Sequence, residues 1–301
     1  MPSPAAMTLI EMYAGYRLAP AAPSRSFEEL RAMSAQMTEA QAPVTDATID
    51  SQQLGGVATE RTRAHGVDAG RIVVYVHGGG YVCGSASGQR GFLAALAREA
   101  AADVYAVDYR LAPEHPYPAA VDDVVDAYVA AVALSGGRPV IVGGDSAGGG
   151  LAVGAVVEMR DRGIALPAAI FALSPWADMT LGSGALNDLA DRDVMVRVND
   201  LTEMRTWYLG ARDPEVPQAS PALADLAGLP PMLVQVGADE ILLGDSQLLV
   251  DRAVAAGIDA RIDVADGMFH TYQVLAPQLP ESREAIASLA RFVVGATGEA
   301  S

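Results

Sequence analysis

Residues 140–150 have the sequence Val140-Ile141-Val142-Gly143-Gly144-Asp145-Ser146-Ala147-Gly148-Gly149-Gly150. The β-branched run at the start predicts a buried strand, and residues 151–159 after it predict a helix. Ser146 therefore stands on a sharp turn between a strand and a helix. Glycines lie two positions before it and two after it, where side chains would collide as the backbone reverses. We expect Ser146 to be a nucleophile.

Two other interpretations of this loop are open. One is a glycine-rich turn that contains a serine by chance. The other is a phosphate-binding loop in a nucleotide-binding protein, although the glycine spacing does not match G-x-G-x-x-G. What surrounds the loop decides between them.

Around it, short β-branched runs alternate with helical patterns. The expected strands are 72–76, 104–107, 140–142, 169–173, 232–236 and 260–264. The expected helices are 91–101, 119–134, 148–162, 246–256 and 281–294. This alternation predicts an α/β protein with a mostly parallel sheet and helices on both faces. Ligands of such sheets bind beyond the carboxyl ends of the strands.

Two segments fall outside this pattern. Residues 1–50 carry apolar side chains at helical spacing and predict N-terminal cap helices. Residues 51–301 then form the catalytic domain, which is interrupted at 180–228 by a long polar and helical stretch. We expect this insertion and the N-terminal helices to cover the active-site end of the sheet.

The composition excludes several classes of protein. With 301 residues, 51% of them hydrophobic, the chain can bury a large core. The net charge of −17 argues against nucleic-acid and anionic-membrane partners, which need a basic surface. All 20 basic residues are arginines, so chemistry that requires a lysine amine is excluded.

The sequence also bears on the compartment. Residues 1–23 lack a basic leading region and are interrupted by Glu11 and Arg17, so they make a poor signal peptide. The single cysteine, Cys83, cannot form an internal disulfide. No run reaches the roughly 18 continuous apolar residues of a membrane span. We expect a cytoplasmic protein, and a homodimer is left open.

A second glycine motif precedes Ser146 by 69 residues. His77-Gly78-Gly79-Gly80 directly follows the expected strand 72–76. Consecutive glycines leave backbone N–H groups unobstructed, as an oxyanion hole requires. The N–H of Ala147, next to the nucleophile, supplies a further donor.

A nucleophilic serine needs a base, and there are four histidines. His65 belongs to a polar loop, His77 to the glycine motif and His115 to a proline-rich turn. His270 follows the expected strand 260–264 and precedes the last helix, so it is the candidate base.

The orienting acid should lie between serine and histidine in the chain. Asp239 stands closest to the end of the strand 232–236, with Glu240 and Asp245 as competitors.

Together these residues resemble the hormone-sensitive-lipase-like carboxylesterases of the α/β-hydrolase fold. The resemblance runs from about Arg71 onward and rests on five ordered motifs and a final histidine loop. They are His77-Gly78-Gly79-Gly80, Asp108-Tyr109-Arg110-Leu111-Ala112-Pro113-Glu114, Gly144-Asp145-Ser146-Ala147-Gly148, Ser220-Pro221, Gly237-Ala238-Asp239-Glu240 and Gly267-Met268-Phe269-His270.

The resemblance implies a catalytic triad and an oxyanion hole. The triad is Ser146, Asp239 and His270. The oxyanion donors are the N–H groups of Gly79, Gly80 and Ala147, with Gly78 supporting the loop. The resemblance also implies a structural role for the segment 109–118, including Arg110, Glu114 and His115.

The expected reaction is hydrolysis of short- to medium-chain carboxylic esters through an acyl-enzyme, without a metal or an organic cofactor. A lactone hydrolase, an amidase or a lipase would share these residues, and a small-molecule receptor on the same fold is the alternative from another class. The expected pocket residues are Tyr81, Trp207, Tyr208 and Phe269. Cys83 is either a thiol near the site or, as we favour, a small buried side chain.

Overall fold

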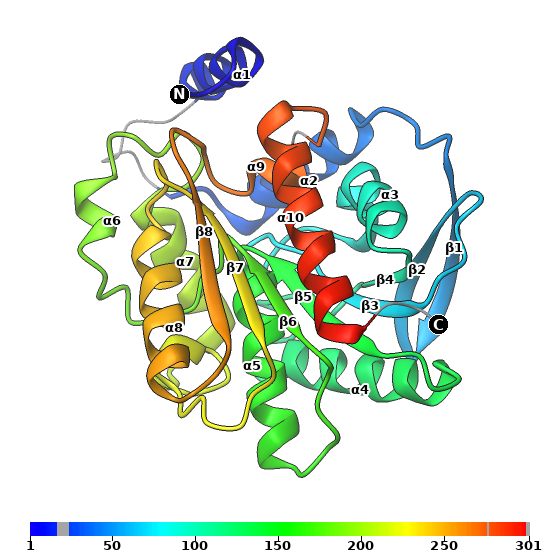
Figure 1. The fold of residues 1–301 in the computed structure, drawn as a ribbon. Helices are drawn as coiled ribbons and strands as arrows, with labels where there is room; N and C mark the ends of the chain where they lie inside the picture. The colour runs from blue at the N-terminus through cyan, green and yellow to red at the C-terminus, as the bar shows by residue number, and fades with distance from the viewer. Residues whose placement is uncertain (17–23, 276, 299–301) are drawn as a thin grey trace.

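The computed structural model describes residues 1–16, 24–275 and 277–298. An eight-stranded sheet runs through it in the order β1-β2-β4-β3-β5-β6-β7-β8 (Figure 1). The strands are β1 (Ala47–Leu54), β2 (Val57–Ala64), β3 (Arg71–Val76), β4 (Ala102–Val107), β5 (Val140–Asp145), β6 (Ile170–Leu173), β7 (Met232–Gly237) and β8 (Ala260–Ala265). Strand β2 is antiparallel to both of its neighbours, and β3 to β8 are parallel. The predicted mostly parallel α/β sheet is confirmed.

The main helices alternate with these strands. They are α3 (Arg90–Glu99), α4 (Ala119–Leu134), α5 (Ala147–Asp161), α8 (Leu243–Ala255) and α10 (Pro280–Thr297). The short elements are η1 (Ala86–Gln89), η2 (Pro221–Leu223), α6 (Ala185–Asp188) and α9 (Tyr272–Leu275). The predicted helices differ from the main five by at most a few residues at each end.

The residues of β3 show how the sheet divides the core into two layers. Ile72, Val74 and Val76 pack in one buried cluster, which also contains the apolar faces of α4, α5 and α8. Val73 and Tyr75 point the other way, into a cluster with α3 and α10. All five are fully buried, so β3 is apolar on both faces, as a central parallel strand must be.

The N-terminal part of the sheet was not predicted. Strand β1 begins at Ala47, so the expected boundary at residue 50 lies inside a strand. The two-residue turn Gly55-Gly56 joins β1 to β2, and both glycines have positive φ. Strand β1 is polar because it lies at the edge of the sheet, and its sequence therefore lacks an apolar run.

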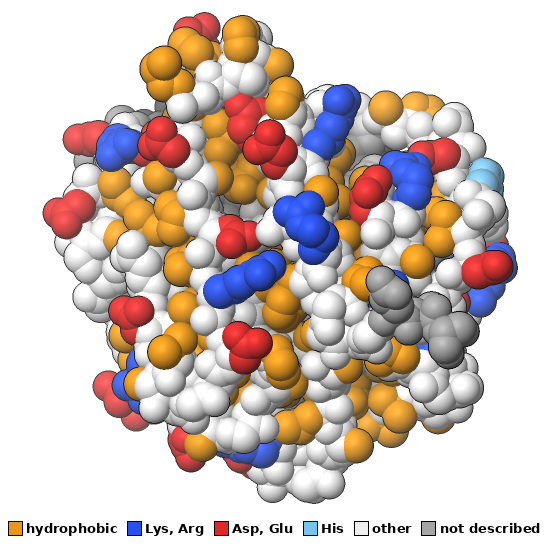
Figure 2. Space-filling view, in the orientation of Figure 1, with side chains coloured by type: hydrophobic (Ala, Val, Ile, Leu, Met, Phe, Trp, Pro, Cys, Tyr) orange, Lys and Arg blue, Asp and Glu red, His pale blue; other side chains and the backbone are white. Residues whose placement is uncertain are grey.

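Three helices outside the alternation pack over the loops. The first, α1 (Pro4–Tyr16), contacts a third buried cluster, which includes Met268 and Phe269. Its outer side is mostly apolar, with Met7 and Met12 about half exposed next to the exposed Glu11, and Figure 2 shows apolar side chains gathered there. The other two are α2 (Phe27–Glu39) and α7 (Val198–Leu209).

Arg31 fastens α2 to the domain. Its Nε donates to Val82 O at 2.8 Å, and its Nη2 donates to Ala112 O at 3.0 Å. The guanidinium also donates twice to Glu114 at 2.7 Å, which lowers the pKa of that carboxyl to about 2. The segment 109–118, for which a structural role was predicted, is thus bonded directly to α2.

Replacing Arg31 tests this anchor. Arg31→Gln should lower the free energy of unfolding by about 1–2 kcal/mol, because two backbone carbonyls lose their donor. Urea denaturation measures the change. Arg63→Gln, which removes an exposed ion pair with Asp50, should cost less than about 0.5 kcal/mol. Equal losses in the two variants would contradict the anchor.

Candidate active site

Ser146 occupies the turn between β5 and α5. Its φ is 55° and its ψ is −125°, a backbone conformation that costs an L-residue about 1–3 kcal/mol. The surrounding backbone holds it there, because Ser146 N–H donates to Leu173 O at 2.8 Å and Ser146 O accepts from Trp176 N–H at 3.0 Å. The predicted strand, sharp turn and helix are all present.

The flanking glycines are required by a backbone contact with β3. A Cβ on Gly144 would lie 2.3 Å from Val76 O, and one on Gly148 would lie 2.2 Å from the same oxygen. The end of β3 and the start of α5 therefore touch without any side chain between them.

Three side chains form a hydrogen-bonded chain at this end of the sheet. His270 Nε2 lies 2.9 Å from Ser146 Oγ, and His270 Nδ1 lies 2.6 Å from Glu240 Oε2. With the proton on Nδ1, the imidazole donates to Glu240 and accepts from the serine hydroxyl. His270 is 6% exposed and Glu240 is fully buried.

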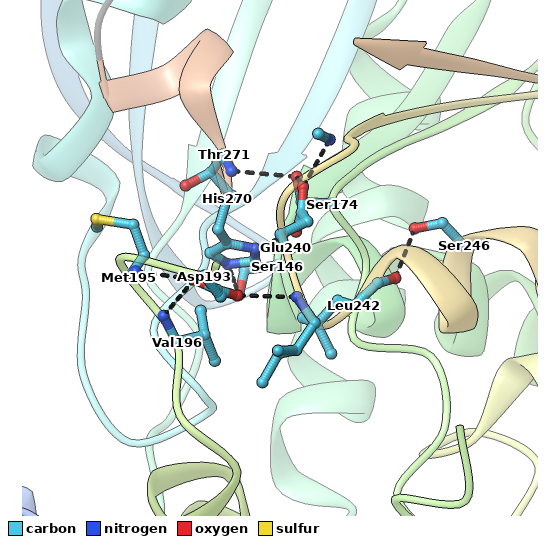
Figure 3. Close-up of polar contacts among 12 residues, drawn as sticks. Ser146, Ser174, Asp193, Met195, Val196, Glu240, Leu242, Ser246, His270 and Thr271 are labelled. Atoms are coloured by element: carbon cyan, nitrogen blue, oxygen red, sulfur yellow. Dashed lines mark hydrogen bonds and ion pairs between the residues drawn. The ribbon is translucent and has the colours of Figure 1, made fainter. Parts of the chain in front are cut away.

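The carboxylate of Glu240 has partners on both oxygens. Its Oε1 accepts from Ser174 Oγ at 2.6 Å and from Gly237 N–H at 2.7 Å. Ser174 Oγ in turn accepts from the N–H of Thr271 at 3.1 Å, so it joins the acid to the loop of His270 (Figure 3). Sequence reasoning missed Ser174, for which only its place directly after β6 was a signal.

The expectation that Asp239 orients His270 is wrong in this structure. After β7 the chain turns, and Asp239 N–H donates to Met268 O while its side chain forms an ion pair with Arg192. That side chain is 26% exposed. Glu240, named as a competitor, is one residue further along and points inward. Closeness to the strand end was a poor criterion because the backbone reverses there.

The other histidines lie elsewhere. His77 is buried, with Nδ1 2.7 Å from Gly78 O and its ring stacked on Tyr109. Burial lowers the pKa of His77. His65 and His115 are exposed. The selection of His270 by elimination agrees with this arrangement.

The glycine motif lies beside Ser146 and is fixed by Asp145. Asp145 Oδ1 accepts from Gly78 N–H at 2.9 Å and from Tyr75 Oη at 2.6 Å. Burial raises the pKa of Asp145 to about 6, although both donors favour its charged form. Position 145 of the serine motif therefore shapes the neighbouring loop, a function that the sequence did not reveal.

The expected oxyanion donors lie in this loop and at the start of α5. Gly79 and Gly80 have φ of 116° and 63°, and no acceptor within the described ranges takes their N–H groups. Ala147 is the first residue of α5, so its N–H has no acceptor inside the helix. Met204 of α7 lies directly over Gly80, since a Cβ there would meet its sulfur at 2.1 Å.

Charges around His270 favour its protonated form. Burial by itself would lower the pKa of His270, but Glu240, Asp193 and Asp145 all raise it, and the net direction is upward. The arrangement suits a base that becomes an imidazolium during the reaction.

The four expected pocket residues differ in their surroundings. Tyr208 of α7 stacks on Tyr81 with ring centroids 3.8 Å apart, and both are fully buried in the core. Trp207 is half-buried and contacts Phe27 of α2 edge to face. Phe269 contacts Tyr13 of α1. Whether these residues line the substrate pocket stays a prediction.

Cys83 is buried, and burial raises the pKa of its thiol to about 11. This is the small buried side chain that we favoured. In residues 1–16, 24–275 and 277–298, no group of three or more His, Cys, Asp or Glu side chains could hold a metal ion.

The chain is similar to known proteins in sequence and in structure. The pattern of the α/β-hydrolase fold family matches residues 73–274. An acetyl-hydrolase of Streptomyces hygroscopicus is 43% identical over 233 residues, 76% of this chain and 77% of the relative. An esterase of Acinetobacter venetianus is 35% identical over 243 residues, 80% of each chain. A crystal structure of an esterase from the bacterial hormone-sensitive lipase family has a TM-score of 0.92 at 40% identity, covering 99% of this chain and 100% of that one.

The contact between β3 and α5 predicts a strong effect at Gly148. Gly148→Ala should destabilise the fold by about 2 kcal/mol or more, as overpacking does, because a backbone oxygen must move. Gly295→Ala in α10 is the matched control, since a Cβ there meets nothing within 4 Å. That variant should be neutral or up to about 1 kcal/mol more stable. Thermal unfolding compares them, and a stable Gly148→Ala protein would contradict the close contact.

Proposed function

The chain belongs to the hormone-sensitive-lipase-like esterases of the α/β-hydrolase fold, and on that premise we propose that it hydrolyses carboxylic esters with Ser146, His270 and Glu240 as its catalytic triad. One observation carries this proposal. The imidazole of His270 bridges the two other side chains at 2.9 Å and 2.6 Å, in the geometry that activates a serine hydroxyl.

In the first half of the reaction, His270 Nε2 takes the proton of Ser146 as its Oγ attacks the ester carbonyl. Glu240 stabilises the resulting imidazolium and fixes the ring. The N–H groups of Gly79, Gly80 and Ala147 are the proposed donors to the tetrahedral oxyanion. The imidazolium then gives its proton to the alcohol oxygen as the C–O bond breaks.

The second half releases the acid. A water molecule gives its proton to His270 Nε2 and attacks the acyl-enzyme carbonyl. The intermediate collapses when Ser146 Oγ leaves and recovers the proton from the imidazolium. The products are one alcohol and one carboxylic acid, and no redox or metal step is needed to balance the reaction.

We propose short- to medium-chain esters as substrates. The names of the relatives, acetyl-hydrolase and esterase, support the short-chain side. A lactone hydrolase, an amidase or a lipase would use the same residues. Initial rates on p-nitrophenyl acetate, butyrate and palmitate, on an anilide and on a lactone separate these substrates.

A receptor on the same fold is the weaker alternative, because it would have no use for the contact between His270 and Ser146. Labelling by a fluorophosphonate probe distinguishes the two. The enzyme should be labelled at Ser146, and a receptor should not.

The surroundings of the triad belong to the same proposal. The N-terminal helices and the segment 180–228 form the cap, and Tyr81, Trp207, Tyr208 and Phe269 are its pocket candidates. No helix in the described part of the chain has the length and apolar character to cross a bilayer. A cytoplasmic location and a homodimer remain predictions.

Substitutions in the triad test the assignment of the acid. Ser146→Ala and His270→Ala should each lower kcat on p-nitrophenyl butyrate at least about 10³-fold. Glu240→Gln should also lower kcat by about 10³-fold or more, because it favours the wrong imidazole tautomer. Asp239→Asn should stay within about threefold, since its partner is the exposed Arg192. The reverse order of the two acid variants would overturn the assignment.

The charge around His270 predicts the pH dependence. Only neutral His270 can accept the serine proton, so kcat/KM should rise with pH through the pKa of His270. That pKa is raised, and the midpoint should therefore lie above about 6.5, the ordinary value for histidine. Burial lowers the pKa of His270, and Glu240→Gln removes one of the negative charges that raise it. The midpoint of the residual activity should therefore move to lower pH in this variant. A midpoint at or below about 6.5 in the wild type would contradict the arrangement.

A further inference from the structure

Asp193 is a buried carboxylate that the triad does not use. It lies in the predicted cap insertion, between α6 and α7, and only 1% of it is exposed. A carboxylate removed from water needs compensating hydrogen bonds or charges, since its desolvation is costly. The partners of Asp193 therefore indicate what keeps it there.

Three backbone amides donate to this carboxylate. Oδ1 accepts from the N–H groups of Met195 and Val196, both at 2.8 Å, which closes a tight turn within the cap. Oδ2 accepts from the N–H of Ile241 at 2.9 Å. Ile241 is the residue after Glu240, so a single side chain joins the cap segment to the loop that carries the acid.

Asp193 also lies next to the imidazole. Figure 3 shows it beside His270, Glu240 and Ser146, with its carboxylate turned toward the acid loop. Burial raises the pKa of Asp193, whereas His270 and the amides of Ile241 and Val196 favour the charged form. The effect is mutual, because Glu240, Asp193 and Asp145 are the carboxylates that raise the pKa of His270.

We propose that Asp193 is a positioning residue for hydrolysis. It holds the loop of Glu240 in place through the Ile241 amide, and it places a second negative charge beside His270. The inference rests on the proposed triad. It makes the cap segment part of the catalytic apparatus, because the imidazolium formed during acyl transfer is then stabilised from the sheet and from the cap.

A neighbouring contact provides a matched control. Arg192 and Asp239 form a second link between the same two segments, but this ion pair is partly exposed and Asp239 faces the guanidinium instead of the imidazole. Asp239→Asn and Asp193→Asn are the same chemical change at the two links between cap and acid loop. Only the second removes charge from beside His270.

The test measures the pKa of His270 directly. NMR titration of the imidazole, assigned with His270→Ala, should show a pKa lower by about one pH unit in Asp193→Asn. In Asp239→Asn it should be unchanged. The same Asp193→Asn protein should lose about tenfold or more in kcat on p-nitrophenyl butyrate. The acidic limb of its kcat/KM profile should move to lower pH.

Two results would overturn the proposed role of Asp193. A lower kcat with an unshifted imidazole pKa would show that Asp193 is only structural, and an unchanged kcat would also overturn the proposal. If Asp193→Asn does not fold, the carboxyl ¹³C shift of Asp193 in the wild type decides, because a protonated group at pH 7 overturns the proposal and a carboxylate supports it. Failure of the esterase itself would show separately, as a wild type that is neither active nor labelled by a fluorophosphonate.

Discussion

The buried carboxylate of Glu240 is the constraint to which the rest of the site conforms. An unpaired charge without exposure to water would be strongly destabilising, so every partner of Glu240 must be in place when the protein folds. Those partners come from three places: Ser174 at the end of β6, Gly237 at the end of β7 and His270 after β8. Satisfying this one group therefore fixes three strand ends relative to one another. Ser146 completes the arrangement from β5.

Backbone strain gathers around the same group. Ser146, Ser174 and Thr271 all have φ near 50°, which is unfavourable for residues with a side chain. Ser146 Oγ lies 2.9 Å from His270, Ser174 donates to Glu240, and Thr271 directly follows His270 and donates to Ser174. The rigid parallel sheet and its two apolar layers supply the stability against which such strain is held.

The sequence was sufficient where residue type and local geometry are tightly linked. Residues 140–150 predicted the strand, turn and helix around Ser146, because only glycine fits the backbone contact that Gly148 makes. The choice of His270 followed from its position after a strand. The family suggested by the ordered motifs is confirmed by relatives that cover most of the chain.

The failures share a physical cause, which is that tertiary packing and not local pattern decided the outcome. Asp239 and Glu240 are adjacent, and only the reversal of the chain after β7 selects the second. Strand β1 is polar because one edge of the sheet faces water, so its composition carries no strand signal. Asp193 and Ser174 bond to segments far away in the chain, and nothing in their local sequence indicates those partners.

Met204 lies over Gly80, next to the hydrogen-bonded side chains of the site but outside their network. The hydrogen bonds that join Ser146, His270 and Glu240 lie at the ends of the strands, whereas Met204 comes from α7 and contributes an unbranched, adaptable thioether. Its side chain contacts Gly80 and takes no part in the hydrogen bonds among Ser146, His270 and Glu240. A substitution at Met204 can therefore change the space beside Gly80 while the hydrogen bonds among Ser146, His270 and Glu240 stay in place.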